Sequence, residues 1–292
     1  MSAPSRRLPA ALAERARAFS AAPGTPVPAR PAATVVLLRD REAGGEADLL
    51  RRRLTMAFAA GMYAFPGGKV DPRDAQASPA WAGPSAEQWG RRLGVAAETA
   101  QAAVCAAVRE TFEEAGVLLA GAGPASVVGD TSGPDWESDR RALLGGGVAL
   151  AELLSRRGLV LRTDLLGAWS RWVTPRFESR RYDTWFFVAA LPEAQQARDV
   201  SGEADAVAWL RPADAVAAAG NGAAAMLPPT WVTLEALAAD GSAAGVLAAA
   251  AARTALAPIT PCTPGWVIEG DDVSTLLPGD EGYPGDDPGG DA

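Results

Sequence analysis

Three glutamates near the middle of the chain have the type and spacing of a metal site. Glu110, Glu113 and Glu114 stand at positions i, i+3 and i+4, so on an α-helix all three project from one face. Like charges at this spacing repel one another, and a divalent cation would remove the repulsion. Ligation by carboxylates alone favours the hard cations Mg²⁺ or Mn²⁺ over zinc. A solvated acidic helix face without a metal has the same spacing, so both interpretations stay open on the glutamates alone.

The composition limits which other chemistry is available. The 292 residues include no histidine, which excludes Ser-His-Asp and Cys-His catalytic systems and imidazole metal sites. Cys105 and Cys262 are the only cysteines, as expected in a reducing compartment. The formal net charge of −8 argues against non-specific nucleic-acid binding, which needs a basic surface. Without an apolar run of membrane-spanning length, the sequence predicts a cytoplasmic protein.

The segment Ala97–Ala115 is predicted to be the helix that carries the glutamates. It contains no glycine or proline, and Val104, Val108 and Phe112 recur at helical spacing. Gly116 follows at the position where helices commonly end. Upstream lies the turn Phe65-Pro66-Gly67-Gly68, whose backbone can approach a metal or a phosphate closely.

Strands and helices follow one another in a mixed order, which favours an α/β sandwich. The predicted strands are Ala32–Leu38, Ala47–Arg53, Trp169–Thr174, Asp183–Leu191 and Ala206–Leu210. Further helical segments are predicted over Pro134–Arg157, broken near Gly145–Gly147, and over Thr230–Ala239, which would close the domain. Asp71–Gly94 contains prolines and glycines and is predicted to be a long loop with at most one helical turn.

Three regions are expected along the chain. Residues 1–31 are punctuated by prolines and are expected to form a flexible arm with at most a short helix around Ala10–Phe19. Residues 32–258 are expected to form the folded domain. Residues 259–292 are rich in Gly, Pro and Asp, which predicts an acidic, mostly disordered tail.

The motif around the glutamates resembles the signature of the Nudix hydrolases, G-x5-E-x7-R-E-U-x-E-E-x-G-U with U aliphatic. Its second half is matched by Arg109, Glu110, Glu113, Glu114, Gly116 and Val117. Gly68 matches the opening glycine, Asp74 stands where the family has Glu, and Thr111 occupies an aliphatic position. The seven-residue spacer is replaced by the much longer segment Ala75–Val108.

One Nudix branch has a long insertion at this place, and the chain resembles that peroxisomal coenzyme A diphosphatase type beyond the signature. The further similar motifs are Trp172-Val173-Thr174-Pro175, Arg181-Tyr182-Asp183-Thr184, Phe186-Phe187, Trp209 with Pro212, and Pro228-Pro229. The resemblance extends from about Ala32 to Ala239. It implies a Nudix-type α/β/α sandwich with a mixed β-sheet and added helices, and it places the insertion at about residues 75–97.

The resemblance also implies roles for individual residues. Glu110, Glu113, Glu114 and the carbonyl of Gly68 would hold Mg²⁺ or Mn²⁺, and Glu110 is the candidate for handling the proton of the attacking water. Arg109 would brace the carboxylates. A further acid comes from a distant loop in many Nudix enzymes. Glu203 is the better candidate, with Asp205 behind it, and the alternative for either is an ordinary loop acid.

Four basic residues are candidates for contacts with substrate phosphates. Arg51 and Arg53 share one face of a predicted strand because side chains alternate along it. Lys69, the only lysine in the chain, follows the glycine turn, and Arg181 lies beside Tyr182. A solvated strand end or turn is the alternative for each of them.

The expected activity is metal-dependent hydrolysis of the diphosphate of coenzyme A or an acyl-coenzyme A. The alternatives are an ADP-ribose, NADH or nucleoside triphosphate pyrophosphatase, and a catalytically silent Nudix-like nucleotide-binding module. The intact glutamates favour an enzyme, whereas Asp74 and the insertion leave room for the silent module. The expected partner is a small nucleotide diphosphate, with no nucleic acid and no membrane, and both a monomer and a homodimer stay open.

Overall fold

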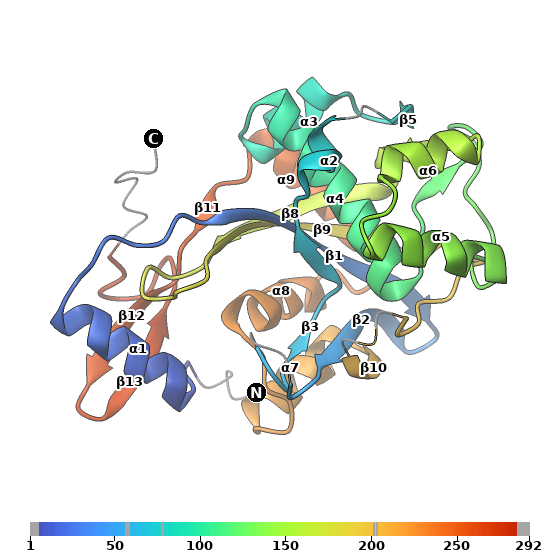
Figure 1. The fold of residues 1–292 in the computed structure, drawn as a ribbon. Coiled ribbons are helices and arrows are strands. Elements are labelled where there is room, and N and C mark those ends of the chain that lie inside the picture. The colour runs from blue at the N-terminus through green and yellow to red at the C-terminus, as the bar shows by residue number, and fades with distance from the viewer. Residues whose placement is uncertain (1–5, 56–58, 77–78, 201, 203, 285–292) are drawn as a thin grey trace.

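A mixed β-sheet forms the centre of the molecule (Figure 1). The computed structural model describes residues 6–55, 59–76, 79–200, 202 and 204–284. In this part of the chain the strand order is β10-β2-β1-β9-β8-β11, with β3 paired to β2 and β4 paired to β1. β1 and β9 run parallel, and β1 is antiparallel to both β2 and β4. The bounds are β1 (Arg30–Arg41), β2 (Gly44–Arg52), β3 (Tyr63–Ala64), β4 (Gly67–Lys69), β8 (Leu166–Val173), β9 (Tyr182–Ala190), β10 (Ala204–Leu210) and β11 (Pro261–Cys262).

Helices cover both faces of this sheet because its central strands are apolar on both sides. Alternate residues of β1 belong to different clusters: Val35 and Leu37 to one core, Val36 and Leu38 to the other. The first core is completed by α3 (Ala86–Leu93), α4 (Ala97–Ala115), α5 (Pro134–Leu144) and α6 (Leu150–Arg156). The second is completed by α7 (Pro212–Gly220), α8 (Pro228–Ala238) and α9 (Ala243–Leu256). The predicted α/β/α sandwich with a mixed sheet is confirmed.

The helix of the glutamates has the predicted bounds, Ala97–Ala115, and Gly116 ends it with a φ of 70°. The predicted break near Gly145–Gly147 separates α5 from α6. The helix α8, however, does not close the domain, because α9 follows it. Among the described residues no single helix is long and apolar enough to span a membrane, and α8 and α9 meet that test only as a pair bent by 105°.

The insertion contains more regular structure than the predicted loop. It forms α2 (Pro72–Gln76), β5 (Trp81–Ala82) and α3. Ser85 and Gln88 form a capping box at the start of α3, and Trp89 and Leu93 are fully buried against α4. The capping signal and two large apolar side chains stabilise a helix that the surrounding prolines and glycines obscured. β5 joins a small separate sheet with β6 (Ala120–Gly121) and β7 (Val160–Arg162), and η1 (Thr163–Leu165) follows.

The two terminal regions pack against each other, which differs from the expected arm and tail. The N-terminal segment forms α1 (Ala10–Ala21), and the C-terminal segment forms the hairpin β12 (Gly265–Glu269) and β13 (Asp272–Leu276). Ala13 and Ala16 of α1 are buried with Phe177 and Val273 in a small third core. Figure 1 shows α1 beside β12 and β13, at the end of the sheet that lies away from α4. Each segment lacks a core of its own, so its apolar face is buried by the other segment and by Phe177 of the β8–β9 loop.

Candidate active site

The helix α4 presents its three glutamates to a cleft at the edge of the core. The apolar residues of α4, including Val104, Val108 and Phe112, are fully buried in the first core. Glu110, Glu113 and Glu114 all line the cleft, and Glu113 and Glu114 are only 4% and 8% exposed. Thr111, at the aliphatic position of the motif, is buried as well, and its hydroxyl donates to the carbonyl of Ala107 at 2.7 Å. That internal bond explains how a polar side chain is accommodated there.

Arg109 is the centre of a buried network of ion pairs. Its Nη1 donates to Glu110 Oε1 at 2.9 Å and to Glu113 Oε2 at 3.0 Å. Its Nε donates to Asp74 Oδ1 and its Nη2 to Asp74 Oδ2, both at 3.0 Å. A further bond runs from Nη2 to the carbonyl of Lys69 at 2.8 Å. Arg109 therefore fixes two of the glutamates relative to α2 and β4.

The glycine turn lets the sheet approach the carboxylates closely. Gly67 N donates to Glu114 Oε2 at 2.9 Å. A Cβ built on Gly68 would lie 2.6 Å from Glu110 Oε2, so the carboxylate occupies the space that any larger residue would fill. Gly67 and Gly68 pair with Thr34 and Ala33 of β1, and this pairing holds the turn in register with the sheet.

The electrostatic environment raises the pKa of two glutamates. Burial raises the pKa of Glu110 to about 7 against the opposing charge of Arg109, and Glu113 adds to the rise. Burial also raises the pKa of Glu113, again against Arg109. Burial would lower the pKa of Arg109, but its bonds to Asp74 and the neighbouring glutamates raise it, so this guanidinium stays charged.

The donor atoms of the site fit a hard cation. Among the described residues no three acidic, cysteine or histidine side chains are already arranged to hold an ion. Arg109 nevertheless binds only one oxygen of Glu110 and one of Glu113, and no other described residue donates to Glu110 Oε2 or Glu113 Oε1. Oxygen-only ligands of this kind suit Mg²⁺ or Mn²⁺.

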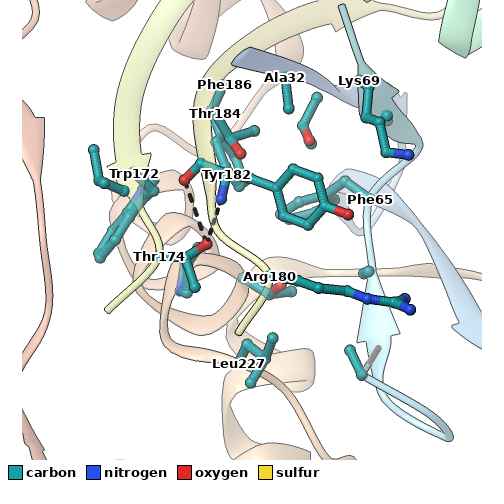
Figure 2. A pocket seen from close by; sticks show the side chains of 18 of the residues that line it. Ala32, Phe65, Lys69, Trp172, Thr174, Arg180, Tyr182, Thr184, Phe186 and Leu227 are labelled. Carbon is teal, nitrogen blue, oxygen red and sulfur yellow. Dashed lines mark hydrogen bonds between the residues drawn. The ribbon is translucent and has the colours of Figure 1, made fainter. Parts of the chain in front are cut away.

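The cleft has a volume of about 730 Å³ and changes character along its length. The carboxylates and the glycine turn lie at one end, and residues of α1, the β8–β9 loop and the C-terminal hairpin line the other. Leu8, Leu12, Trp172 and Phe177 give that second end apolar wall surface, and Glu178 and Thr275 also line it. Figure 2 shows Thr174 bonded to the backbone of Tyr182 at the base of the β8–β9 loop. A space of this size holds a cofactor-sized ligand.

The structure brings some of the predicted phosphate-binding residues to the cleft and not others. Lys69 lines it. Arg51 and Arg53 do not, whereas Arg52 between them does. Arg51 is ion-paired with Asp205 at 2.6 Å. Side chains alternate along β2, so Arg51 and Arg52 point to opposite faces of the sheet.

The remaining predicted residues have other positions. Arg181 is 7% exposed and donates to the carbonyls of Thr174 and Val27 at 3.0 and 2.9 Å, so it braces the β8–β9 loop. Glu203 lies outside the described residues. Asp205, the second candidate acid, is exposed and paired with Arg51.

Several residues of the cleft were not predicted. Asp74, which does not itself line the cleft, was assigned only a position in the motif, and its bond to Arg109 across the insertion was not predicted. Leu8, Leu12 and Phe177 belong to regions that lack a local signal for binding.

Comparison with known proteins identifies relatives of this chain. Residues 87–237 match the profile of the NUDT19 Nudix domain. The acyl-coenzyme A diphosphatase NUDT19 of Gallus gallus is 30% identical over 202 residues, which are 63% of this chain and 52% of the chicken protein. This chain therefore spans about half the length of that relative.

A solved structure is similar over more of the fold. The crystal structure of a Nudix hydrolase from Alicyclobacillus acidocaldarius shares 32% sequence identity and a TM-score of 0.64. The match covers 80% of this chain and 99% of the bacterial one. The similarity thus includes the sheet and helices that position the glutamates.

Proposed function

This chain belongs to the Nudix hydrolase family, with a Nudix domain of the NUDT19 type, and we propose that it hydrolyses the diphosphate of coenzyme A or an acyl-coenzyme A. The observation that carries the proposal is the two-ended cleft. Carboxylates from α4 line one end, and apolar side chains from α1 and the β8–β9 loop line the other. A ligand with a charged diphosphate and a long, largely apolar arm fits both ends.

The charged end has the groups that diphosphate hydrolysis requires. Glu110, Glu113 and Glu114, together with the carbonyl of Gly68, would hold Mg²⁺ or Mn²⁺. A bound cation neutralises phosphate charge and lowers the pKa of a coordinated water. Glu110, which Arg109 holds in place, is the group that would take up a proton from the attacking water. Water adds across one P–O bond and gives two phosphate monoesters.

The apolar end accounts for the acyl-coenzyme A part of the proposal. Leu8, Leu12, Trp172 and Phe177 offer a wall for a pantetheine or acyl chain, and burying apolar surface there is favourable at about 25 cal/mol per Å². The chicken relative is named as an acyl-coenzyme A diphosphatase, which agrees with this substrate class.

The experiment is a hydrolysis screen with purified protein and Mg²⁺ or Mn²⁺. The panel contains coenzyme A, short- and long-chain acyl-coenzyme A, ADP-ribose, NADH and nucleoside triphosphates, with products identified by mass spectrometry. Glu114→Gln is the inactivating variant. Glu98→Gln is the matched control, because Glu98 lies on the same helix but is exposed and does not line the cleft.

Preferred cleavage of coenzyme A compounds, lost in Glu114→Gln and kept in Glu98→Gln, is the expected result. Preferred cleavage of ADP-ribose, NADH or a nucleoside triphosphate would overturn the substrate. Full activity of Glu114→Gln would overturn the placement of the catalytic centre on α4.

A further inference from the structure

A second, smaller pocket opens beside the cleft where β1 begins, β4 ends and β9 begins. Its lining includes Arg30, Lys69, Arg180 and Arg181, together with Val27, Pro28, Ser179 and Tyr182. Four of these eight residues are cationic and none is acidic. In a chain with a formal net charge of −8, such a local excess of positive charge is a site for an anion.

Three of these cations are available to a ligand. Within the described residues, Arg30, Lys69 and Arg180 have no ion-pair partner, and all three are exposed. Arg181 differs, since its guanidinium binds the carbonyls of Thr174 and Val27. Arg181 therefore holds the β8–β9 loop, which carries Arg180, against the segment before β1, which carries Val27.

The register of the sheet connects this pocket to the catalytic end of the cleft. Lys69 pairs with Ala32 of β1, and Arg30 pairs with Tyr182 of β9. Arg30 and Ala32 point to the same face, one step of about 7 Å apart. Gly68, one residue before Lys69, lies against Glu110. The pocket thus begins at Lys69, the residue that follows the glycine in contact with Glu110.

Both cavities share Lys69, Arg180 and Tyr182 in their walls. Figure 2 shows Lys69 from β4 and Arg180 from the β8–β9 loop extending on either side of the Tyr182 ring, toward the side on which its hydroxyl lies. One ligand can therefore occupy the cleft and the basic pocket together.

We propose that the pocket lined by Arg30, Lys69 and Arg180 binds a phosphate monoester that the substrate carries apart from its scissile diphosphate. The inference rests on the proposed function, since coenzyme A has such a group on its ribose 3′ oxygen. Guanidinium and ammonium groups form strong charge-assisted hydrogen bonds to phosphate oxygens. This pocket would select substrates by that second phosphate, whereas the carboxylates of α4 act on the diphosphate.

The test compares coenzyme A with dephospho-coenzyme A, which lacks only the 3′-phosphate. The variant is Arg30→Ala with Arg180→Ala, and both side chains are exposed. The matched control is Arg41→Ala with Arg91→Ala, two exposed arginines that line neither cavity. We expect the wild type and the control to prefer coenzyme A in kcat/KM by about tenfold or more. In the pocket variant this preference disappears through a higher KM for coenzyme A.

A binding measurement separates this inference from the proposed function. Calorimetry compares adenosine 3′,5′-bisphosphate with adenosine 5′-monophosphate on the same proteins, without turnover. Tighter binding of the bisphosphate, lost in the pocket variant, supports the pocket even if no diphosphate is hydrolysed. Hydrolysis of coenzyme A and dephospho-coenzyme A with equal kcat/KM, or an unchanged preference in the variant, overturns the pocket and leaves the proposed diphosphatase intact.

Discussion

Substituting the two glycines of the turn separates catalysis from folding. In Gly68→Ala the new Cβ would lie 2.5 Å from the carboxyl carbon of Glu110, and its three nearest neighbours would all be atoms of that carboxylate. Ordinary contact between such atoms begins near 3.5 Å, so the carboxylate must retreat by about 1 Å. A displacement of that size at reacting groups lowers turnover by about 100-fold. We therefore expect Gly68→Ala to fold and to lose about two orders of magnitude in kcat.

Gly67→Ala is the matched comparison, one residue earlier in the same strand. Its Cβ would lie 2.6 Å from the carbonyl oxygen of Ala33 and 2.8 Å from Thr34 Cα. These are backbone atoms of β1, which cannot rotate away as a carboxylate can. Overpacking of this kind costs about 1–3 kcal/mol, so Gly67→Ala should lower the free energy of unfolding while Gly68→Ala should not.

Steady-state kinetics at saturating Mn²⁺, urea denaturation and a double-mutant cycle test this reasoning. Glu110→Asp shortens the side chain by one methylene and withdraws its carboxylate from Gly68. In that background Gly68→Ala should have little further effect, because the contact that it disturbs has gone. A kcat of Gly68→Ala within about threefold of the wild type, or strictly additive effects in the cycle, would refute the assignment of Glu110 to the reacting centre.

Three further outcomes are expected from single substitutions. Asp74→Asn removes a charged partner of the buried Arg109, so we expect kcat to fall by about tenfold or more, and the melting temperature to fall as well because a buried ion pair loses one member; an unchanged kcat would show that this ion pair does not position the glutamates. Asp48 is fully buried, neither carboxylate oxygen has a hydrogen bond among the described residues, and burial raises its pKa from 3.8 to about 7. Between pH 4 and 7 the folded state therefore holds a proton that the unfolded state releases, and wild-type stability falls by about 4 kcal/mol as the pH rises through this window. Urea denaturation of Asp48→Asn should show that slope removed, and parallel pH profiles would contradict the buried charge. Leu12→Glu introduces a charge at the apolar end of the cleft, so kcat/KM for long-chain acyl-coenzyme A should fall by about tenfold relative to coenzyme A; an equal fall for both substrates would place the acyl chain elsewhere.

The sequence predicted those parts of the site that depend on local signals. The bounds of α4 follow from a glycine-free helical segment and from Gly116, whose φ of 70° ends the helix. Because the helix was correct, the common face of Glu110, Glu113 and Glu114 was correct as well. The glycine turn was likewise recognisable, since Gly67 and Gly68 are the residues that permit close backbone approach.

Contacts between distant segments could not be predicted in this way. Asp74 reaches Arg109 across an insertion whose fold depends on α3 packing against α4. Arg52, rather than the predicted Arg51 and Arg53, lines the cleft because one residue of register reverses the face of a strand. α1 and the hairpin β12–β13 stabilise each other, so neither segment shows in its own sequence that it is part of a folded structure.

The residues that line the cleft come from inside and outside the part of the chain that matches the NUDT19 Nudix domain. The proposed catalytic groups and the proposed substrate selectivity therefore need different tests. The glutamates of α4 lie within residues 87–237, which match the NUDT19 Nudix domain, so family membership bears directly on them. Leu8, Leu12 and Arg30, which line the apolar end and the basic pocket, lie outside that match. One glutamate variant therefore tests the proposed catalytic end, whereas the proposed substrate choice needs paired substrates that differ by one phosphate or one acyl chain.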